Sequence, residues 1–430
     1  MKPTSIALLC LAIHAGALAD DWPQFAGPSR NGHSAETSGW GDDWAPKRLW
    51  TKKVGRGCTS PIIVDGKVYV MGWEGPGRAR GNTKGKDVLR CLDLRTGEQL
   101  WAVEDRERYQ GRTAKGDTGQ YGGPNATPAY DADTGYIYTL SVDGKLIARD
   151  TKQRGRVVWG RSMFERALKY NIPQRPNVGG GLRDFGFTAS PLIYGDWVII
   201  EVGAKQGTLV AFDKRKGTEA WRSQFNQPAG HSPGPVVMST ERGDVLALLA
   251  LKQLVVIDLA GKPGRTIAEH PWATDYACNI PQPAVTDAGL VLTSGYNHKQ
   301  VRRLSLTGEK LNADWTARAY ATVAPPVVVD GKVFLLDRSM YCVNVDSGKV
   351  HWRGGRYDHG SMIATADGKI LALARGTLTL VDAEAGGHRE LARIDKLVPG
   401  TCYPHLALAD GIVLCKDREG NLTAVKLKRD

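Results

Sequence analysis

The 430-residue sequence lacks an apolar run long enough to cross a membrane as a helix. A membrane-spanning helix needs about 20 consecutive apolar residues, and the N-terminal apolar run, residues 6–13, is much shorter. Long apolar stripes with a helical period are also scarce, whereas glycine is abundant, at 51 residues. These features argue against a transmembrane segment and favour a chain with many tight turns.

The first residues, 1–19, have the organisation of a secretory signal peptide. Lys2 supplies the positive charge, residues 6–13 form the apolar segment, and Ala17-Leu18-Ala19 forms a small-x-small cleavage site. The sequence therefore predicts an exported protein, periplasmic or secreted, with residues 20–430 forming a single mature domain.

Cysteine is scarce and scattered. Of seven cysteines, Cys10 lies in the leader, and the preceding Leu9 stands where a lipoprotein signal would have a small residue, so a lipid anchor is not expected. The others form no C-x-x-C pair, no C-x-x-C-H haem site and no adjacent pair, which excludes a dense disulfide framework. Most are expected to be small buried side chains. They are Cys58, Cys91, Cys278, Cys342, Cys402 and Cys415.

The formal net charge is +12 and the isoelectric point is near 9.3. A basic protein is attracted to anionic glycans, membrane surfaces or nucleic acids. No dense run of lysine and arginine is present, and the predicted export makes nucleic acid an unexpected partner.

The strongest signal is an internal repeat in which two short aliphatic strands are joined by Asp-Gly or a similar pair. Asp-Gly accepts the positive φ angles of a tight hairpin turn. Two further strands follow in each copy, with a period of roughly 40–60 residues, and this arrangement predicts an all-β, eight-bladed β-propeller with four-stranded antiparallel blades. The copies begin at Ser60, Thr127, Ser190, Gly234, Gln282, Pro325, Met362 and Pro404.

The two ends of the chain complement each other. The last copy ends with "NLTAVKLKRD" after its third strand, and "APKRLWTKKV" near the N-terminus supplies an unpaired strand. A closed ring must cover its edge strands, so we expect the N-terminal strand to complete the last blade.

Tryptophan recurs in the outer strand of the copies, often four residues after a turn glycine. Such an indole can pack on the neighbouring blade and donate its N–H to a backbone carbonyl, so we expect these tryptophans to dock blades rather than bind a cofactor. The seventh copy has "GGHREL" instead, which predicts a looser seam. The expected docking residues are Trp50, Trp101, Trp159, Trp221, Trp272, Trp315 and Trp352.

The repeats carry a family resemblance. "CLDLRTGEQLW" (91–101) and "AFDKRKGTEAW" (211–221) resemble the A-x-D-x-x-T-G-x-x-x-W motif of pyrroloquinoline-quinone (PQQ)-type repeats. These repeats occur in quinoprotein alcohol dehydrogenases and in the outer-membrane assembly lipoprotein BamB. The segment "DWPQFAGPSRNG" (21–32) resembles the opening of secreted bacterial proteins of this class, with Ala26 where arginine is usual.

The resemblance to quinoproteins implies PQQ held between a tryptophan and a disulfide of adjacent cysteines, a calcium ion on carboxylate and amide ligands, and a catalytic aspartate. The sequence has no adjacent cysteines and no recognisable calcium constellation. No catalytic residue is therefore assigned, and PQQ remains possible without an assigned site. The acylated cysteine that anchors the assembly lipoprotein is not expected here either.

Three long insertions, residues 73–87, 102–127 and 160–190, are predicted at one face of the ring, over blades one to three. Long loops on a rigid scaffold commonly carry binding sites. We expect a mildly basic, partly aromatic binding face there, and the alternative is loops without a function. The candidate binding residues are Arg78, Arg80, Tyr121, Arg175, Arg183 and Phe185.

A second candidate region is the channel mouth, where the first strand of each blade begins. Cysteine and histidine side chains gather there in the predicted ring, and they are weak candidates for a metal site, because three or four ligands must converge within about 2.0–2.3 Å of a zinc ion. Cys58 and Cys402 lie in adjacent blades and could instead form a disulfide, and hydrogen-bonded polar lining is the third alternative. The candidates are Cys58, Cys402, His231, His359 and His405, with Cys278 nearby.

Two functions follow from these observations. The first is a non-catalytic, monomeric binding scaffold with a protein or glycan partner on the loop-rich face. The alternative is a quinone- or metal-dependent oxidoreductase with its site at the channel mouth. A weaker idea is recognition of carbohydrate or polyanions by the basic loops.

Overall fold

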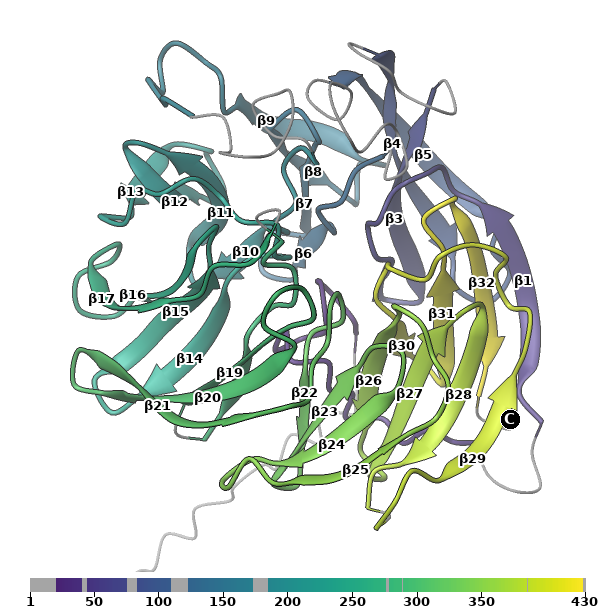
Figure 1. Ribbon diagram of the computed structural model, residues 1–430. Helices are drawn as coiled ribbons and strands as arrows, with labels where there is room; N and C mark the ends of the chain where they lie inside the picture. Colours follow the sequence, from purple (N-terminus) through teal and green to yellow (C-terminus); the bar gives the residue numbers. More distant parts are fainter. Residues whose placement is uncertain are drawn as a thin grey trace, which may run out of the picture.

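The computed structural model describes residues 21–40, 45–75, 83–109, 123–172, 185–275, 278–287, 289–384 and 386–427. Every named element in these ranges is a β-strand. The strands form eight separate four-stranded antiparallel sheets arranged in a ring (Figure 1). The predicted eight-bladed β-propeller is confirmed.

The blades follow one another in sequence order, with the innermost strand of each blade first. Blade 1 contains β2 (Ile62–Val64), β3 (Lys67–Glu74), β4 (Thr83–Asp93) and β5 (Gln99–Tyr109), and blade 2 contains β6 (Ala129–Asp131), β7 (Tyr136–Leu140), β8 (Lys145–Asp150) and β9 (Arg156–Ser162). Blade 3 contains β10 (Leu192–Tyr194), β11 (Trp197–Ala204), β12 (Gly207–Asp213) and β13 (Glu219–Arg222), and blade 4 contains β14 (Val236–Thr240), β15 (Gly243–Leu249), β16 (Gln253–Asp258) and β17 (Thr266–Pro271).

The second half of the ring has the same arrangement. Blade 5 contains β18 (Ala284–Thr286), β19 (Gly289–Ser294), β20 (Gln300–Thr307) and β21 (Lys310–Ala317), and blade 6 contains β22 (Val327–Val329), β23 (Lys332–Leu336), β24 (Met340–Asn344) and β25 (Val350–Gly354). Blade 7 contains β26 (Ser361–Thr365), β27 (Lys369–Ala374), β28 (Thr377–Asp382) and β29 (Glu390–Ile394), and blade 8 contains β30 (Ala407–Ala409), β31 (Ile412–Lys416), β32 (Asn421–Lys426) and β1 (Lys47–Lys53).

The ring is closed by its N-terminal strand, as predicted. β1 pairs antiparallel with β32, the last strand of the chain, and Trp50 lies opposite Ala424. Figure 1 shows β1 (purple) beside β32 (yellow), so the two ends of the sequence share one blade. The pairing gives the outer edge of β32 a partner, which an open end would lack.

Six of the expected docking tryptophans occupy one register position, directly after a β-bulge in the outer strand. A bulge re-aims the side chain that follows it, and here the indole is directed toward the next blade. The pairs across the sheet are Trp50–Ala424, Trp101–Cys91, Trp159–Ala148, Trp221–Ala211, Trp315–Arg303 and Trp352–Cys342.

Trp272 does not dock a blade in this way, and the expectation for this residue is corrected. In blade 4 the register position opposite Val256 is filled by Ala268, four residues earlier. Trp272 follows the end of β17 and stacks on His298, with ring centroids 4.4 Å apart, while Arg302 lies over the indole at 5.5 Å. The indole is buried in the core cluster that blades 4 and 5 share, so it still packs against the following blade from another position.

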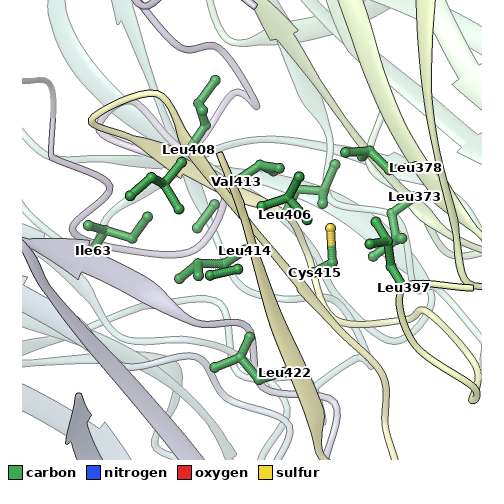
Figure 2. Packing of buried hydrophobic residues seen from close by; sticks show 14 of the residues in the cluster. Ile63, Leu373, Leu378, Leu397, Leu406, Leu408, Val413, Leu414, Cys415 and Leu422 are labelled. Atoms are coloured by element: carbon green, nitrogen blue, oxygen red, sulfur yellow. The ribbon is translucent and has the colours of Figure 1, made fainter. Parts of the chain in front are cut away.

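The seam after blade 7 is filled by aliphatic side chains in place of a tryptophan. Ala392 stands at the docking register, opposite Leu380. Figure 2 shows Leu373, Leu378 and Leu397 next to side chains of blade 8, within a cluster that extends to Ile63 of blade 1. Close-packed aliphatic side chains stabilise such a seam through the apolar area they bury.

The N-terminal segment, residues 21–40, lies inside the ring and contacts every blade. It enters at the end of the ring that carries the turns between the first and second strands, which we name the hairpin end, whereas the mouth end is where the first strands begin. Trp22 pairs with Ile63 of blade 1, and Glu36 accepts the backbone N–H groups of Asp410 and Gly411 in blade 8 at 2.7 and 2.8 Å.

The same segment reaches the other blades through backbone atoms and polar side chains. Pro23 O accepts from Tyr130 of blade 2, and Ser38 binds Asp367 of blade 7 through its backbone N–H and its hydroxyl, both at 2.7 Å. The His33 imidazole hydrogen-bonds the backbone of Val328 in blade 6. Blades 3, 4 and 5 contact the segment at Arg30, described below. The segment therefore closes the channel from the hairpin end.

Candidate functional site

The channel mouth is built from the residues that precede the first strand of each blade. In the first three blades a serine or threonine stands directly before a proline, as Ser60, Thr127 and Ser190. The proline directly precedes the first strand, at a position where no N–H is needed, and the hydroxyl before it is directed to the neighbouring blade.

These hydroxyls tie consecutive blades together. The backbone N–H of His405 donates to Ser60 Oγ at 2.7 Å, that of Ser60 to Thr127 Oγ1 at 3.0 Å, and that of Thr127 to Ser190 Oγ at 2.9 Å. The series ends where Ser190 N–H donates to Pro233 O at 2.7 Å. Five blades are joined in this way, and the buried N–H groups of this series are satisfied by neighbouring blades.

Arg30 of the N-terminal segment lies below this series. Its guanidinium donates to Pro191 O at 3.0 Å and to Pro233 O at 3.1 Å, and Gln282 Nε2 donates to Arg30 O at 3.5 Å. Blades 3, 4 and 5 therefore meet at this residue. Burial lowers the pKa of the guanidinium to about 9, because desolvation disfavours a charged group.

His405 is a buried structural residue of the mouth. Its ring lies 5.2 Å from the ring of Phe25, and Nδ1 is 3.1 Å from Leu406 O. Burial lowers the pKa of His405 to about 4, so the imidazole is neutral at physiological pH.

His359 has the opposite electrostatic environment. Its Nδ1 lies 3.5 Å from a carboxylate oxygen of Asp337, and this contact raises the pKa of His359. Burial opposes ionisation of Asp337, but hydrogen bonds from His359 and from the backbone N–H of Thr322 lower the pKa of this carboxyl overall. The two side chains form a partly exposed histidine–aspartate pair.

The remaining candidates for a metal or disulfide site at the mouth, His231, Cys58 and Cys402, do not form a common site. His231 is buried, and its ring packs edge-on against Phe185 at 4.6 Å. Cys58 and Cys402 are not joined by a disulfide, so that alternative is not realised in the structure, and burial raises the pKa of Cys402 to about 12. Across the described ranges, no three or more His, Cys, Asp or Glu side chains are grouped so that they could hold a metal ion.

Most of the expected loop residues cannot be placed. Arg78, Arg80, Tyr121, Arg175 and Arg183 lie outside the described residues, and only Phe185 is described. However, β4 leads out of the first insertion and β5 leads into the second, and both strands are described. β4 and β5 have 11 residues each, and their pairing continues to Thr83 opposite Tyr109, so blade 1 projects beyond the ring at the mouth end (Figure 1).

Two buried cations near the mouth were missed by the sequence reasoning. One is Arg30, which stood in the quoted segment 21–32 without a role. The other is Lys416, whose Nζ donates to Gly57 O at 2.6 Å and whose pKa is lowered by burial to about 8. No local pattern marked Lys416, because its environment is created by the closure of blade 8 on blade 1.

The donor set of the described residues does not fit the quinone site that the resemblance implies. None of the six described cysteines forms a disulfide, and no two of them are adjacent in the sequence. A calcium ion takes six to eight oxygen ligands, and the described acidic residues form no group of three or more with such a geometry. The centre of the ring is occupied by Arg30 and Phe25 of the chain itself.

Comparison with known proteins agrees with the ring of repeats. The curated relatives include the dehydrogenase subunit of an alcohol dehydrogenase (quinone) from Komagataeibacter europaeus, 29% identical over 168 residues, which are 38% of this chain and 19% of that protein. A 1-butanol dehydrogenase (cytochrome c) from Thauera butanivorans is 29% identical over 136 residues, 30% of this chain and 17% of that protein. The chain thus spans about a fifth of the length of these relatives.

Solved structures show the same fold at low identity. BamB from Moraxella catarrhalis aligns with a TM-score of 0.60 and 12% identity, over 89% of this chain and 100% of that chain. Quinohemoprotein alcohol dehydrogenase from Comamonas testosteroni aligns with a TM-score of 0.65 and 15% identity, over 96% of this chain and 81% of that chain.

A family model described as the outer membrane protein assembly factor BamB matches residues 84–354. This match covers more than half of the chain, and the eight blades carry the same repeat. The protein belongs to this family of PQQ-like β-propellers.

Proposed function

We propose that the protein is an exported binding scaffold of the cell envelope, without chemistry of its own, that presents its mouth end to a protein partner. The family description, an outer membrane protein assembly factor, supports the location and the scaffold role. Two features found together carry the proposal. Residues 21–40 of the protein itself fill the channel, and blade 1 projects beyond the ring.

The filled channel favours a surface function over an enclosed reaction chamber. Arg30 holds blades 3 and 4 from inside, and the hydroxyls of Ser60, Thr127 and Ser190 are engaged by neighbouring blades. Side chains whose polar atoms are held in this way stabilise the ring and are not available as nucleophile or base.

The projection of blade 1 is braced by blade 2. Arg149 is almost fully buried and donates to both carboxylate oxygens of Asp105 at 2.5 and 2.6 Å, and Lys145 Nζ donates to Arg106 O at 2.9 Å. Both contacts are made by Arg149 Nη2, and such a charge-assisted hydrogen bond links blade 2 to β5. Rigid elements position binding residues better than free loops do, which suits a docking surface on β4 and β5.

Photo-crosslinking in intact cells tests the proposal. A photoreactive amino acid replaces Arg106, exposed on the projecting strand β5, or Lys216, exposed in the turn between β12 and β13 at the hairpin end. We expect a discrete protein adduct from position 106 and none from position 216. Equal labelling from both positions would contradict a docking surface at the mouth end.

A second measurement addresses the oxidoreductase alternative. Purified protein is titrated with PQQ in the presence of calcium, with quinone absorbance and dye-linked alcohol oxidation as readouts. We expect neither saturable absorbance nor oxidation. Saturable uptake of the quinone together with alcohol oxidation would overturn the scaffold proposal.

A further inference from the structure

A cavity of about 350 Å³ opens at blade 7, away from the projecting strands of blade 1. Arg356 and Tyr357 line it from the connection between β25 and β26, and Arg375 lines it from the turn between β27 and β28. Glu390 and Arg393 line it from β29. The connection and the turn both lie at the mouth end, because they precede a first strand and follow a second strand.

The cavity carries an excess of positive charge. Three guanidinium groups and one carboxylate line it. Glu390 is already bound by Arg393 through two contacts, at 2.5 and 2.8 Å. Among the described residues, neither Arg356 nor Arg375 has an acidic partner, and both are exposed at the opening. Two guanidinium groups are therefore left to attract an anion.

The backbone of the turn that carries Arg375 has a defined conformation. Arg375 and Gly376 have φ angles of 53° and 76°, which is the geometry of a two-residue hairpin turn that Asn, Asp or Gly normally begins. A residue with a Cβ adopts this conformation at a cost. Gly376 O accepts from Leu397 N–H at 2.8 Å, which fixes the turn.

Apart from these charged groups, the cavity is lined by uncharged side chains. Tyr357 is buried, and its hydroxyl is 2.8 Å from His388 Nε2, so its ring is held as a fixed wall. Thr379 of β28 is buried and adds a hydroxyl to the lining. A volume of this size is at the lower limit of ordinary ligand pockets, which begin at about 300 Å³, and it suits a molecule the size of a monosaccharide.

We propose that this cavity binds a small organic anion through a carboxylate or phosphate group held by Arg356 and Arg375. Arginine matches both groups because its planar N–H donors can contact two oxygens at once. The site is independent of the proposed docking surface on blade 1. Sugar acids and sugar phosphates combine an anionic group with hydroxyls that match the polar lining.

Isothermal titration calorimetry of the whole protein at low salt tests the proposal. The probes are glucuronate for the carboxylate, glucose 6-phosphate for the phosphate, and glucose as the neutral analogue. We expect saturable binding of at least one anion and none of glucose. The anion that binds more tightly identifies the group, and the affinity falls as sodium chloride is added.

Variants connect the binding to the cavity. Arg375→Ala and Arg356→Ala should each lower the affinity by about tenfold or more, since each removes a charge-assisted hydrogen bond. Glu390→Gln should raise the affinity because it frees Arg393. Arg389→Ala is the matched control, since this exposed arginine of the same blade faces Asp382 and lies outside the lining.

Two results would overturn the proposal. One is the absence of saturable binding for both anions. The other is an equal loss of affinity in the Arg389→Ala and Arg375→Ala variants, which would indicate general surface charge.

Discussion

The indole N–H of Trp50 donates to Leu94 O at 2.9 Å, and this contact joins the last blade to the first. The same relationship recurs where Trp159 donates to Lys214 O at 3.0 Å and Trp315 to Val345 O at 2.9 Å. In each pair the indole lies over the turn glycine of the following blade. The N-terminal strand thus closes the ring through the same contact between an indole N–H and a backbone carbonyl that joins other neighbouring blades.

Replacement of Gly97 by alanine tests this packing. A Cβ on Gly97 would lie 2.6 Å from the Trp50 indole, and its φ is 69°. Gly308 is the matched control, with a φ of 63° and nothing within 4 Å of the added Cβ. We expect Gly308→Ala to lower the free energy of unfolding by about 1 kcal/mol and Gly97→Ala by about 3 kcal/mol. Equal losses in urea unfolding would show that the indole contributes little at this seam.

Arg30 is predicted to stabilise the ring from inside. Arg30→Met leaves Pro191 O without this donor, whereas Pro233 O keeps the Ser190 N–H, so we expect a loss of about 1–3 kcal/mol in the free energy of unfolding. Arg48→Met is the control, because Arg48 makes a comparable guanidinium–carbonyl contact, with Lys396 O at 2.9 Å, at an exposed site. We expect that variant to change stability by less than about 0.5 kcal/mol. An unchanged Arg30→Met protein would mean that desolvation of the guanidinium offsets its bonds.

The repeat made the ring and its closure predictable, whereas the register of single tryptophans depended on loop lengths. Ala268 stands four residues after Gly264 and fills the docking position of blade 4. Trp272 stands four residues further along the chain and therefore misses this position. Trp315 is seven residues after Gly308 and still docks, because β20 and β21 are longer and pair up to the tight turn. Distance from a glycine therefore predicts the position only when the hairpin length is constant.

The contents of the channel could not be predicted from spacing. The segment 21–40 carries no strand pattern, and its many partners are distributed over the whole chain, from Ile63 to Gly411. The proline-preceding hydroxyls of Ser60, Thr127 and Ser190 were visible as a repeated pair, but their partners appear only when the blades are adjacent. These contacts join segments that are far apart in the sequence, so they can be recognised only once the closed ring has placed the blades side by side.

The hydrogen bond between the His405 N–H of blade 8 and Ser60 Oγ of blade 1 can be tested by mutation. Ser60→Ala removes the acceptor of the His405 N–H, and a buried donor without a partner costs about 1–3 kcal/mol. Ser60→Thr should retain most of the stability, because Thr127 holds the equivalent position in blade 2. Hydrogen exchange of the His405 amide reports the bond directly. Rapid exchange in the alanine variant and slow exchange in the threonine variant are expected, and unchanged protection in both would contradict the assignment.

Two histidines of the mouth are predicted to respond to pH with opposite signs. The pKa of His405 is lowered to about 4 by burial, so between pH 4 and 6.5 the unfolded chain binds a proton that the folded protein does not. Stability therefore falls as the pH falls through this window. The pKa of His359 is raised by Asp337, so its contribution is complete below the unfolded pKa, near 6.5, and is lost as the pH rises through the folded pKa.

Urea unfolding at pH 7 and pH 5 separates the two effects. On acidification the native protein should lose about 2 kcal/mol through His405, and His405→Gln should remove that part of the loss. His359→Gln should instead destabilise the protein more at pH 5 than at pH 8, because the variant lacks the ion pair with Asp337. Proton NMR titration of the two imidazoles gives the pKa values independently. If His405 titrates near 6.5 in the folded protein, its ring is hydrated, which would contradict its burial beside Phe25.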